Sequence, residues 1–336
     1  MILRRVAIVG AGAVGGCLGA RLAAAGDCEV SALARGETLA ALRRHGWRLH
    51  SGDTVVQAPA IAADDPAALG VQDLLVVAVK GPSMASVAER VGPLIGPDTV
   101  ILPAMNGVPW WFGHGLSGTA RGMKLESVDP DGALARALPP AQVIGCVVHI
   151  AAGLRAPGVV GHKMGWGLVV GEPLGGTSDR LTAVQALLKR AGFDVSVPAD
   201  IHQAVWYKLW GNITMNPVSS LTRATSDRIL GDPLVRAFCS AVMVEVAAVG
   251  TRIGCAIDQT PEDRYRVASK LGAFKTSMLQ DVESGREIEL DGIVGAVREI
   301  AARVGLATPN LDALFGLTRL MGQQLGLYPA PEIVPG

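Results

Sequence analysis

The chain has 336 residues, 49% of them hydrophobic, and its 30 Lys and Arg residues balance its 30 Asp and Glu residues. This length is enough for about two domains. A net charge of zero excludes a global field that would recruit nucleic acid or an anionic membrane, so the composition favours a small-molecule partner. The five cysteines have no CxxC spacing and the six histidines no HExxH-like spacing, so neither a disulfide framework nor a metal site is indicated.

The first residues, two arginines before an apolar run, share features with a secretory signal. Five glycines between Gly10 and Gly19 are unfavourable for a signal helix, and no clear cleavage site is present. No uninterrupted apolar run reaches the ~18 residues needed to span a bilayer. The closest candidates are interrupted, one of them by Glu245 and Arg252. We therefore expect a soluble, cytoplasmic protein.

A glycine-rich turn directly after the apolar run 6–9 predicts a dinucleotide site. Gly10 permits a tight turn, Gly12 has no Cβ to block a pyrophosphate, and Gly15 lets the next helix lie close to its strand. The free N–H groups and positive dipole end of that helix would hold the phosphates. The cofactor-binding residues predicted here are Gly10, Ala11, Gly12, Ala13, Val14 and Gly15.

Arg35 follows the second predicted strand, residues 29–35, about 20 residues after the glycine turn. An Asp or Glu at this position would bind the ribose 2′-hydroxyl of NAD. A guanidinium can instead hold a 2′-phosphate through two charge-assisted hydrogen bonds, so Arg35 favours NADP(H). Glu37 lies close enough in the sequence to weaken this distinction between NADP(H) and NAD(H). The alternative is that Arg35 is an ordinary solvated arginine at a strand end.

Two later apolar runs, residues 73–79 and 99–102, have the length of buried parallel strands. Ligands collect outside the carboxyl ends of such strands. Lys80 is therefore expected near the cofactor phosphates or adenosine, and Asn106 near the nicotinamide or the substrate. The alternatives are a surface lysine and local turn chemistry at Asn106-Gly107.

Residues 110–140 form an irregular segment that would suit a mobile flap. Its aromatic residues, Trp110 to Phe112, either close over a substrate or pack in the core. We expect strands over 142–152, 158–161 and 167–171 that complete the sheet in antiparallel fashion. A helix over 181–191 and a last short strand over 193–197 follow. We place the domain boundary after Pro198, so that residues 1–198 form a Rossmann-type domain and residues 199–336 a helical one.

Lys208, Asn212 and Asn216 recur at four-residue intervals on the first helix of the second half, and so share one face. Apolar residues surround them, and burying such groups unpaired costs several kcal/mol each. They are therefore expected to converge on something polar. Pro217 should end or kink the helix there. A solvated stripe or an Asn C-cap is the alternative.

Taken in order along nearly the whole chain, these motifs resemble those of the ketopantoate reductase (2-dehydropantoate 2-reductase) family. The resemblance rests on the glycine turn, Lys80, Asn106-Gly107, Lys208-x3-Asn212-x3-Asn216-Pro217, Thr276-Ser277-Met278-Leu279-Gln280-Asp281 and Glu289-x-Asp291-x3-Gly295. It implies an α/β fold in which an N-terminal Rossmann-type dinucleotide-binding domain is followed by an all-α C-terminal domain. The site would lie in the cleft between them.

The resemblance also implies NADPH-dependent reduction of a 2-oxo acid to a 2-hydroxy acid, foremost 2-dehydropantoate to pantoate in pantothenate and coenzyme A biosynthesis. Lys208 would donate a proton to the keto oxygen, and Glu289 would orient the lysine and the substrate. The substrate-binding residues would be Asn106, Asn212, Asn216, Ser277 and Glu289. Apolar surroundings lower the pKa of a lysine whereas Glu289 or a bound carboxylate raises it, so the sequence leaves the direction open.

Two departures from the family pattern favour a paralogue that reduces a bulkier 2-oxo acid as an alternative. Met105 stands where glutamine is frequent, and Val294 where asparagine is frequent. A dehydrogenase of the 3-hydroxyacid or 6-phosphogluconate type, and a non-catalytic NADP-sensing protein, are further alternatives. Apolar helices expected over 235–249 and 296–304 offer enough surface for a homodimer.

Overall fold

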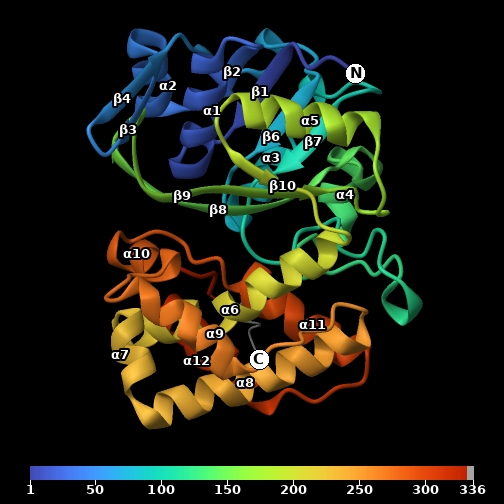
Figure 1. Ribbon diagram of the computed structural model, residues 1–336, viewed down its shortest axis with the longest axis vertical. Helices are drawn as coiled ribbons and strands as arrows, with labels where there is room; N and C mark the ends of the chain where they lie inside the picture. Colours follow the sequence, from blue (N-terminus) through green and yellow to red (C-terminus); the bar gives the residue numbers. More distant parts are fainter. Residues whose placement is uncertain (331–336) are drawn as a thin grey trace, which may run out of the picture.

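A parallel five-stranded sheet forms the centre of the N-terminal half in the computed structural model, which describes residues 1–330 (Figure 1). Its strands lie in the order β5 (Ile61–Ala63), β2 (Glu29–Leu33), β1 (Arg5–Val9), β6 (Leu74–Val77) and β7 (Val100–Pro103). Helices α1 (Ala13–Ala25), α2 (Gly36–His45) and α3 (Met84–Ala88) connect them. Strand order reverses between β1 and β6, and a ligand crevice is expected outside the carboxyl ends of the strands at such a point.

A second sheet packs on the opposite side of α1. It contains β4 (Thr54–Ala58), β3 (Trp47–Ser51), β9 (Val159–Gly171) and β10 (Asp194–Ser196), with β8 (Gly145–Ala156) antiparallel to β9. Glycines on α1 make this contact close, because a Cβ on Gly16 would lie 2.4 Å from Val160 and one on Gly19 2.4 Å from Trp47. Helix α5 (Asp179–Arg190) leads from β9 to β10.

The prediction that residues 142–171 complete the first sheet in antiparallel fashion is wrong. Only Val143 bridges that sheet, and it pairs in parallel with Ile101. The chain then enters the second sheet, where the two strands predicted after residue 157 form the single strand β9. A chain with two sheets gives the same local apolar pattern as one with a larger sheet, so strand partners could not be read from it.

The C-terminal half is helical (Figure 1). Its helices are α6 (Ile201–Thr222), α7 (Ser226–Gly231), α8 (Pro233–Arg252), α9 (Pro261–Ala268), α10 (Ser277–Glu283), α11 (Ala296–Arg303) and α12 (Pro309–Gln324), with a π-helical turn over Asp291–Gly295 before α11. The connection from β10 to α6 spans residues 197–200, and the predicted boundary after Pro198 falls within it.

Helix α6 does not end at Asn216. It continues through Pro217 to Thr222, so the predicted helix end and the alternative of an Asn C-cap are both wrong. The hydroxyls of Ser219 and Ser220 donate to the carbonyl of Asn216 at 3.0 and 2.9 Å in this part of the helix.

The aromatic residues 110–112 lie in the core where the two halves meet. Trp111 is 1% exposed, and Phe112 stacks on Trp206 of α6 with ring centroids 6.0 Å apart. Of the two alternatives for Trp110 to Phe112, the structure shows the second, packing in the core. The rest of the segment contains short turns and the helix α4 (Ala133–Ala137).

Helix α8 is long and apolar enough, by length and composition alone, to cross a membrane. One side of it is buried in the helical half through Val242, Met243 and Val246. Its Glu245 carboxylate accepts hydrogen bonds from the backbone N–H groups of Asn310 and Leu311, at 3.0 and 2.9 Å, at the start of α12. In this structure α8 is therefore a packed helix of the helical half.

Candidate active site

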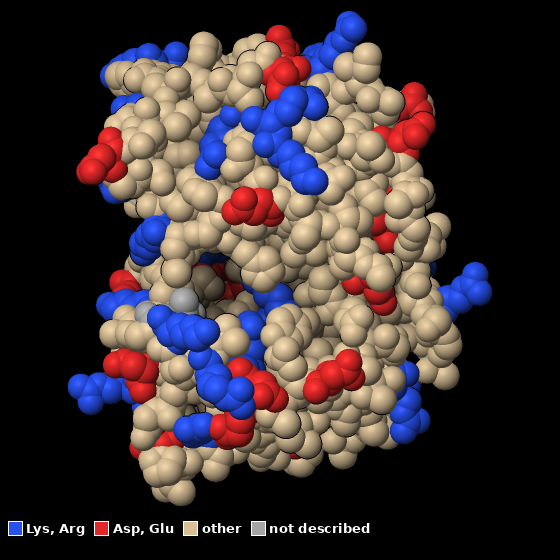
Figure 2. Space-filling model, in the orientation of Figure 1, with Lys and Arg blue, Asp and Glu red and all other residues tan. Residues whose placement is uncertain are grey.

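The first side-chain cluster lies where α6 meets the nucleotide-binding half. Lys208 on α6 donates from Nζ to Oδ1 of Asn106, in the loop after β7, at 2.6 Å. It also donates to the backbone carbonyl of Val148 on β8 at 2.6 Å. The molecular surface has a hollow between the two halves, with basic and acidic side chains at its edge (Figure 2). The lysine thus joins both halves of the chain, as its predicted role requires.

A small cavity of about 20 Å³ adjoins Lys208, enough for about one water molecule. Asn106, Asn212, Met105, Trp111 and Cys146 are among the residues that line it. Cys146 and the Val148 carbonyl of β8 had no signal in the sequence, because nothing there indicated which strand faces the lysine.

Burial lowers the pKa of Lys208 from its ordinary 10.5 to about 8. The charge of Arg264 acts in the same direction, whereas Cys146 and Glu289 oppose it. Burial is the largest of these effects. The direction that the sequence left open is therefore downward.

Glu289 and Lys80 form a second polar cluster between the halves. The Oε1 atom of Glu289 accepts from the backbone N–H of Gly81 at 3.1 Å. Lys80 forms an ion pair with the buried carboxylate of Asp281 on α10, which Arg286 Nε also contacts at 3.1 Å. Burial raises the pKa of Glu289, against the opposing effect of the Gly81 N–H and the nearby lysine charges. Asp281 was noted only as the end of a motif, and its partner on the other half could not be inferred.

The remaining predicted substrate residues are less closely grouped. Asn212 lies beside Lys208 at the cavity, one turn further along α6. Asn216 is buried, with 4% of its surface exposed, and among residues 1–330 its Nδ2 has no hydrogen-bond partner. Ser277 is exposed at the first turn of α10, whose N-cap is Thr276. The structure thus joins Asn106, Lys208 and Asn212, and places neither Asn216 nor Ser277 at the cavity.

The glycine turn fits a bound pyrophosphate. Gly10 has φ +92°, and a Cβ on Gly15 would lie 2.1 Å from the Gly10 carbonyl oxygen, so both positions require glycine. A Cβ on Gly12 would meet no atom within 4 Å, because open space lies in front of it. Helix α1 begins there with no side-chain cap and no acidic residue in its first turn. Its N–H groups are therefore free to bind an anion.

Arg35 lies at the start of α2 and lines an open groove of about 400 Å³. Arg155, from the β8–β9 hairpin, lines the same groove and was not predicted. The hairpin reaches α2 because Gly158 at its tip packs on Ala41, where a Cβ would lie 2.8 Å away. Two arginines from distant parts of the chain thus line one groove beside α2. Because Arg35 and Arg155 are far apart in the sequence, the sequence alone could not indicate that they line the same groove.

Comparisons with known proteins agree with this geometry. Residues 6–175 match the family described as ketopantoate reductase PanE/ApbA, and residues 200–322 match its C-terminal part. A 2-dehydropantoate 2-reductase of Mesorhizobium japonicum is 39% identical over 324 residues, which cover 96% of this chain and 99% of that protein.

Two solved structures share the whole architecture. A crystal structure from Ralstonia solanacearum, described as a ketopantoate reductase, has a TM-score of 0.93 at 52% identity and covers 97% of this chain and 100% of its own. The 2-dehydropantoate 2-reductase of Geobacter metallireducens has a TM-score of 0.81 at 28% identity, with 94% and 99% covered. The predicted fold class, a Rossmann-type domain followed by a helical domain, is confirmed. The chain belongs to the ketopantoate reductase family, as its motifs predicted.

Proposed function

We propose that this protein catalyses the NADPH-dependent reduction of 2-dehydropantoate to pantoate, a step of pantothenate and coenzyme A biosynthesis, in the cytoplasm. The observation that carries the proposal is the contact between Lys208 and Asn106, which brings an ammonium of one half to the strand ends of the other. Full-length similarity to a protein named 2-dehydropantoate 2-reductase supports the choice of substrate.

The chemistry follows from the residues at the lysine. NADPH supplies the hydride when it is bound. Lys208 donates its proton to the keto oxygen, and its pKa of about 8 makes it a stronger acid than an ordinary lysine while leaving it mostly protonated at neutral pH. Asn106 and the Val148 carbonyl hold the ammonium in place. Glu289 orients the lysine and the substrate, and Asn212, Asn216 and Ser277 bind the substrate's carboxylate and hydroxyl groups.

We assign NADP(H) rather than NAD(H) from the groove at the end of β2. Arg35 and Arg155 both line it, and two guanidinium groups suit the charge of a 2′-phosphate. Replacing either arginine by alanine should weaken NADPH binding about 10- to 100-fold, the range for hydrogen bonds to charged groups. NADH binding, followed by the same fluorescence titration, should change little. Equal weakening of both cofactors would contradict the assignment.

Steady-state oxidation of NADPH with a panel of 2-oxo acids tests the reaction. Lys208→Ala should lower turnover at least ~100-fold with unchanged NADPH affinity, as expected for loss of general-acid catalysis. The exposed Lys189 on α5 provides a matched control, Lys189→Ala, that should keep full activity. If another 2-oxo acid is reduced and 2-dehydropantoate is not, the assignment of 2-dehydropantoate as the substrate is rejected. No turnover with any of the acids would favour the NADP-sensing alternative.

We also propose a homodimer. Helix α8 exposes Leu234 and Val244, with 81% and 59% of their surfaces accessible, which supports burial against a second copy. Light scattering should then give twice the 34.7 kDa of the chain. A mass of one chain at micromolar concentration would contradict this part of the proposal.

A further inference from the structure

Arg264 on α9 lies directly against the helix that carries Lys208. Its guanidinium occupies the space beside Gly211, where a Cβ would come within 2.4 Å of Nε and 2.5 Å of Nη2. The same group lies 5.1 Å from the ring centroid of Tyr207, one turn earlier on α6. Gly211 is three residues after Lys208, which corresponds to a rise of about 4.5 Å along the helix. The missing side chain at residue 211 thus makes room for a second cation near the lysine.

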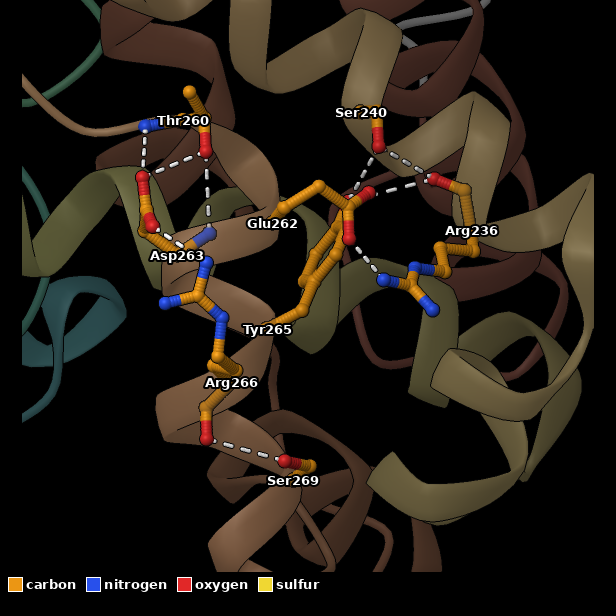
Figure 3. Close-up of polar contacts among 8 residues, drawn as sticks. All are labelled: Arg236, Ser240, Thr260, Glu262, Asp263, Tyr265, Arg266 and Ser269. Carbon is orange, nitrogen blue, oxygen red and sulfur yellow. Dashed lines mark hydrogen bonds and ion pairs between the residues drawn. The ribbon is translucent and has the colours of Figure 1, made fainter.

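The helix that carries Arg264 is firmly anchored. Thr260 and Asp263 form a capping box at its start, and the Tyr265 hydroxyl lies 3.1 Å from the Ser240 hydroxyl of α8 (Figure 3). Glu262 forms an ion pair with Arg236 of α8 (Figure 3). These contacts fix the other side of α9 to α8. Arg264 is therefore presented to α6 by a rigid support.

In the described part of the chain, no carboxylate is paired with this guanidinium. Among residues 1–330, Arg264 takes part in no side-chain hydrogen bond or ion pair, although it is half-buried. Its positive charge reaches across to Lys208 and to His149 on β8, since it adds to the effect of burial in lowering the pKa of each. Like charges so close together are unfavourable unless an anion joins them. Arg264 itself is therefore left without an anionic partner among the described side chains.

We propose that Arg264 is the charged partner of the 2-oxo acid's carboxylate, in addition to the neutral side chains already assigned to it, while Lys208 faces the keto oxygen. In a 2-oxo acid the carboxylate carbon is bonded directly to the keto carbon, which suits two cations that lie within about one turn of each other beside α6. The planar fork of a guanidinium matches a carboxylate through two parallel hydrogen bonds. Arg264 thereby selects acids over uncharged ketones. This inference rests on the proposed function and adds a specificity residue to it.

The test compares a 2-oxo acid with its methyl ester in unchanged protein and in Arg264→Ala. We expect kcat/KM for the acid to fall about 10- to 100-fold, mainly through KM, because a charged hydrogen-bond partner is lost. The ester should lose less than about threefold. Calorimetric binding of the 2-hydroxy acid product to the protein with NADP+ should weaken by the same factor as the acid's kcat/KM, and Arg264→Lys should restore part of it.

Arg266→Ala is the matched control, since Arg266 lies on the same helix and is paired with Asp263 at 2.9 Å in an exposed position. It should leave both substrates and the melting temperature unchanged. Gly211→Ala gives independent support, because its Cβ would displace the guanidinium and so lower acid turnover while Arg264 is retained. If Arg264→Ala lowers kcat/KM equally for the acid and the ester, or leaves the kinetics of the acid unchanged, this inference is overturned while the proposed function stands. Absence of both turnover and product binding in the unchanged protein overturns the proposed function as well.

Discussion

The acidity of Lys208 predicts a specific pH dependence of the reduction. A pKa of about 8 instead of 10.5 corresponds to about 3 kcal/mol against the charged form. Because the pKa of this amine is lowered, the proton donor is present below about pH 8 and is lost as the pH rises through it. About nine-tenths of Lys208 is protonated at pH 7 and about one-tenth at pH 9. We therefore expect kcat/KM for the 2-oxo acid to fall about tenfold between these values.

The assay is the initial rate of NADPH oxidation at saturating cofactor and low 2-oxo acid, in buffers of constant ionic strength. An ordinary lysine would remain almost fully protonated up to about pH 9, so it would give a flat profile. Lys208→Arg carries a charge at every accessible pH, and any residual activity should lack the alkaline decline. A flat profile in the unchanged protein, or the same decline in Lys208→Arg, would refute the assignment of Lys208 as the proton donor.

Two further predictions address the same site and the cofactor turn. Asn106→Asp places a carboxylate where the amide oxygen now lies 2.6 Å from Lys208 Nζ, so it should raise the pKa of Lys208 and move the alkaline decline upward by about 1 pH unit or more; an unmoved decline would contradict the contact. Gly12→Ala should keep the melting temperature but weaken NADPH binding at least about tenfold, because its Cβ enters only the open space in front of α1. Gly15→Ala should instead lower the melting temperature, since its Cβ would meet the Gly10 carbonyl at 2.1 Å, and the opposite pattern in thermal scans and fluorescence titrations would exclude this account of the turn.

Local sequence patterns predicted those parts of the fold that depend on neighbouring residues. The strand β1, the glycine turn and α1 follow directly from an apolar run and three spaced glycines. Lys208 and Asn212 were placed on one helix face by their spacing, and both line the cavity that the structure shows. In these cases the information lies within about one helical turn of the residues concerned.

Features that depend on distant partners could not be obtained in this way. The pairing of Lys80 with Asp281 joins two halves of the chain, and Arg155 reaches the groove of Arg35 only because a long hairpin folds back on α2. The helix end predicted at Pro217 is wrong for a related reason. Tertiary packing of α6, whose residues on both sides of the proline are buried, maintains a helix that local propensity would end.

The choice of neutral partners for Lys208 connects its position to its acidity. An ammonium has three N–H donors, and two of them are used by the Asn106 amide oxygen and the Val148 carbonyl. A carboxylate in either place would hold the lysine equally well but would raise its pKa and make it a poorer acid. The neutral oxygens fix the amine in a buried site without cancelling the effect of burial, and they leave one donor for the substrate oxygen. The same contacts that orient the proton therefore allow it to be transferred near neutral pH.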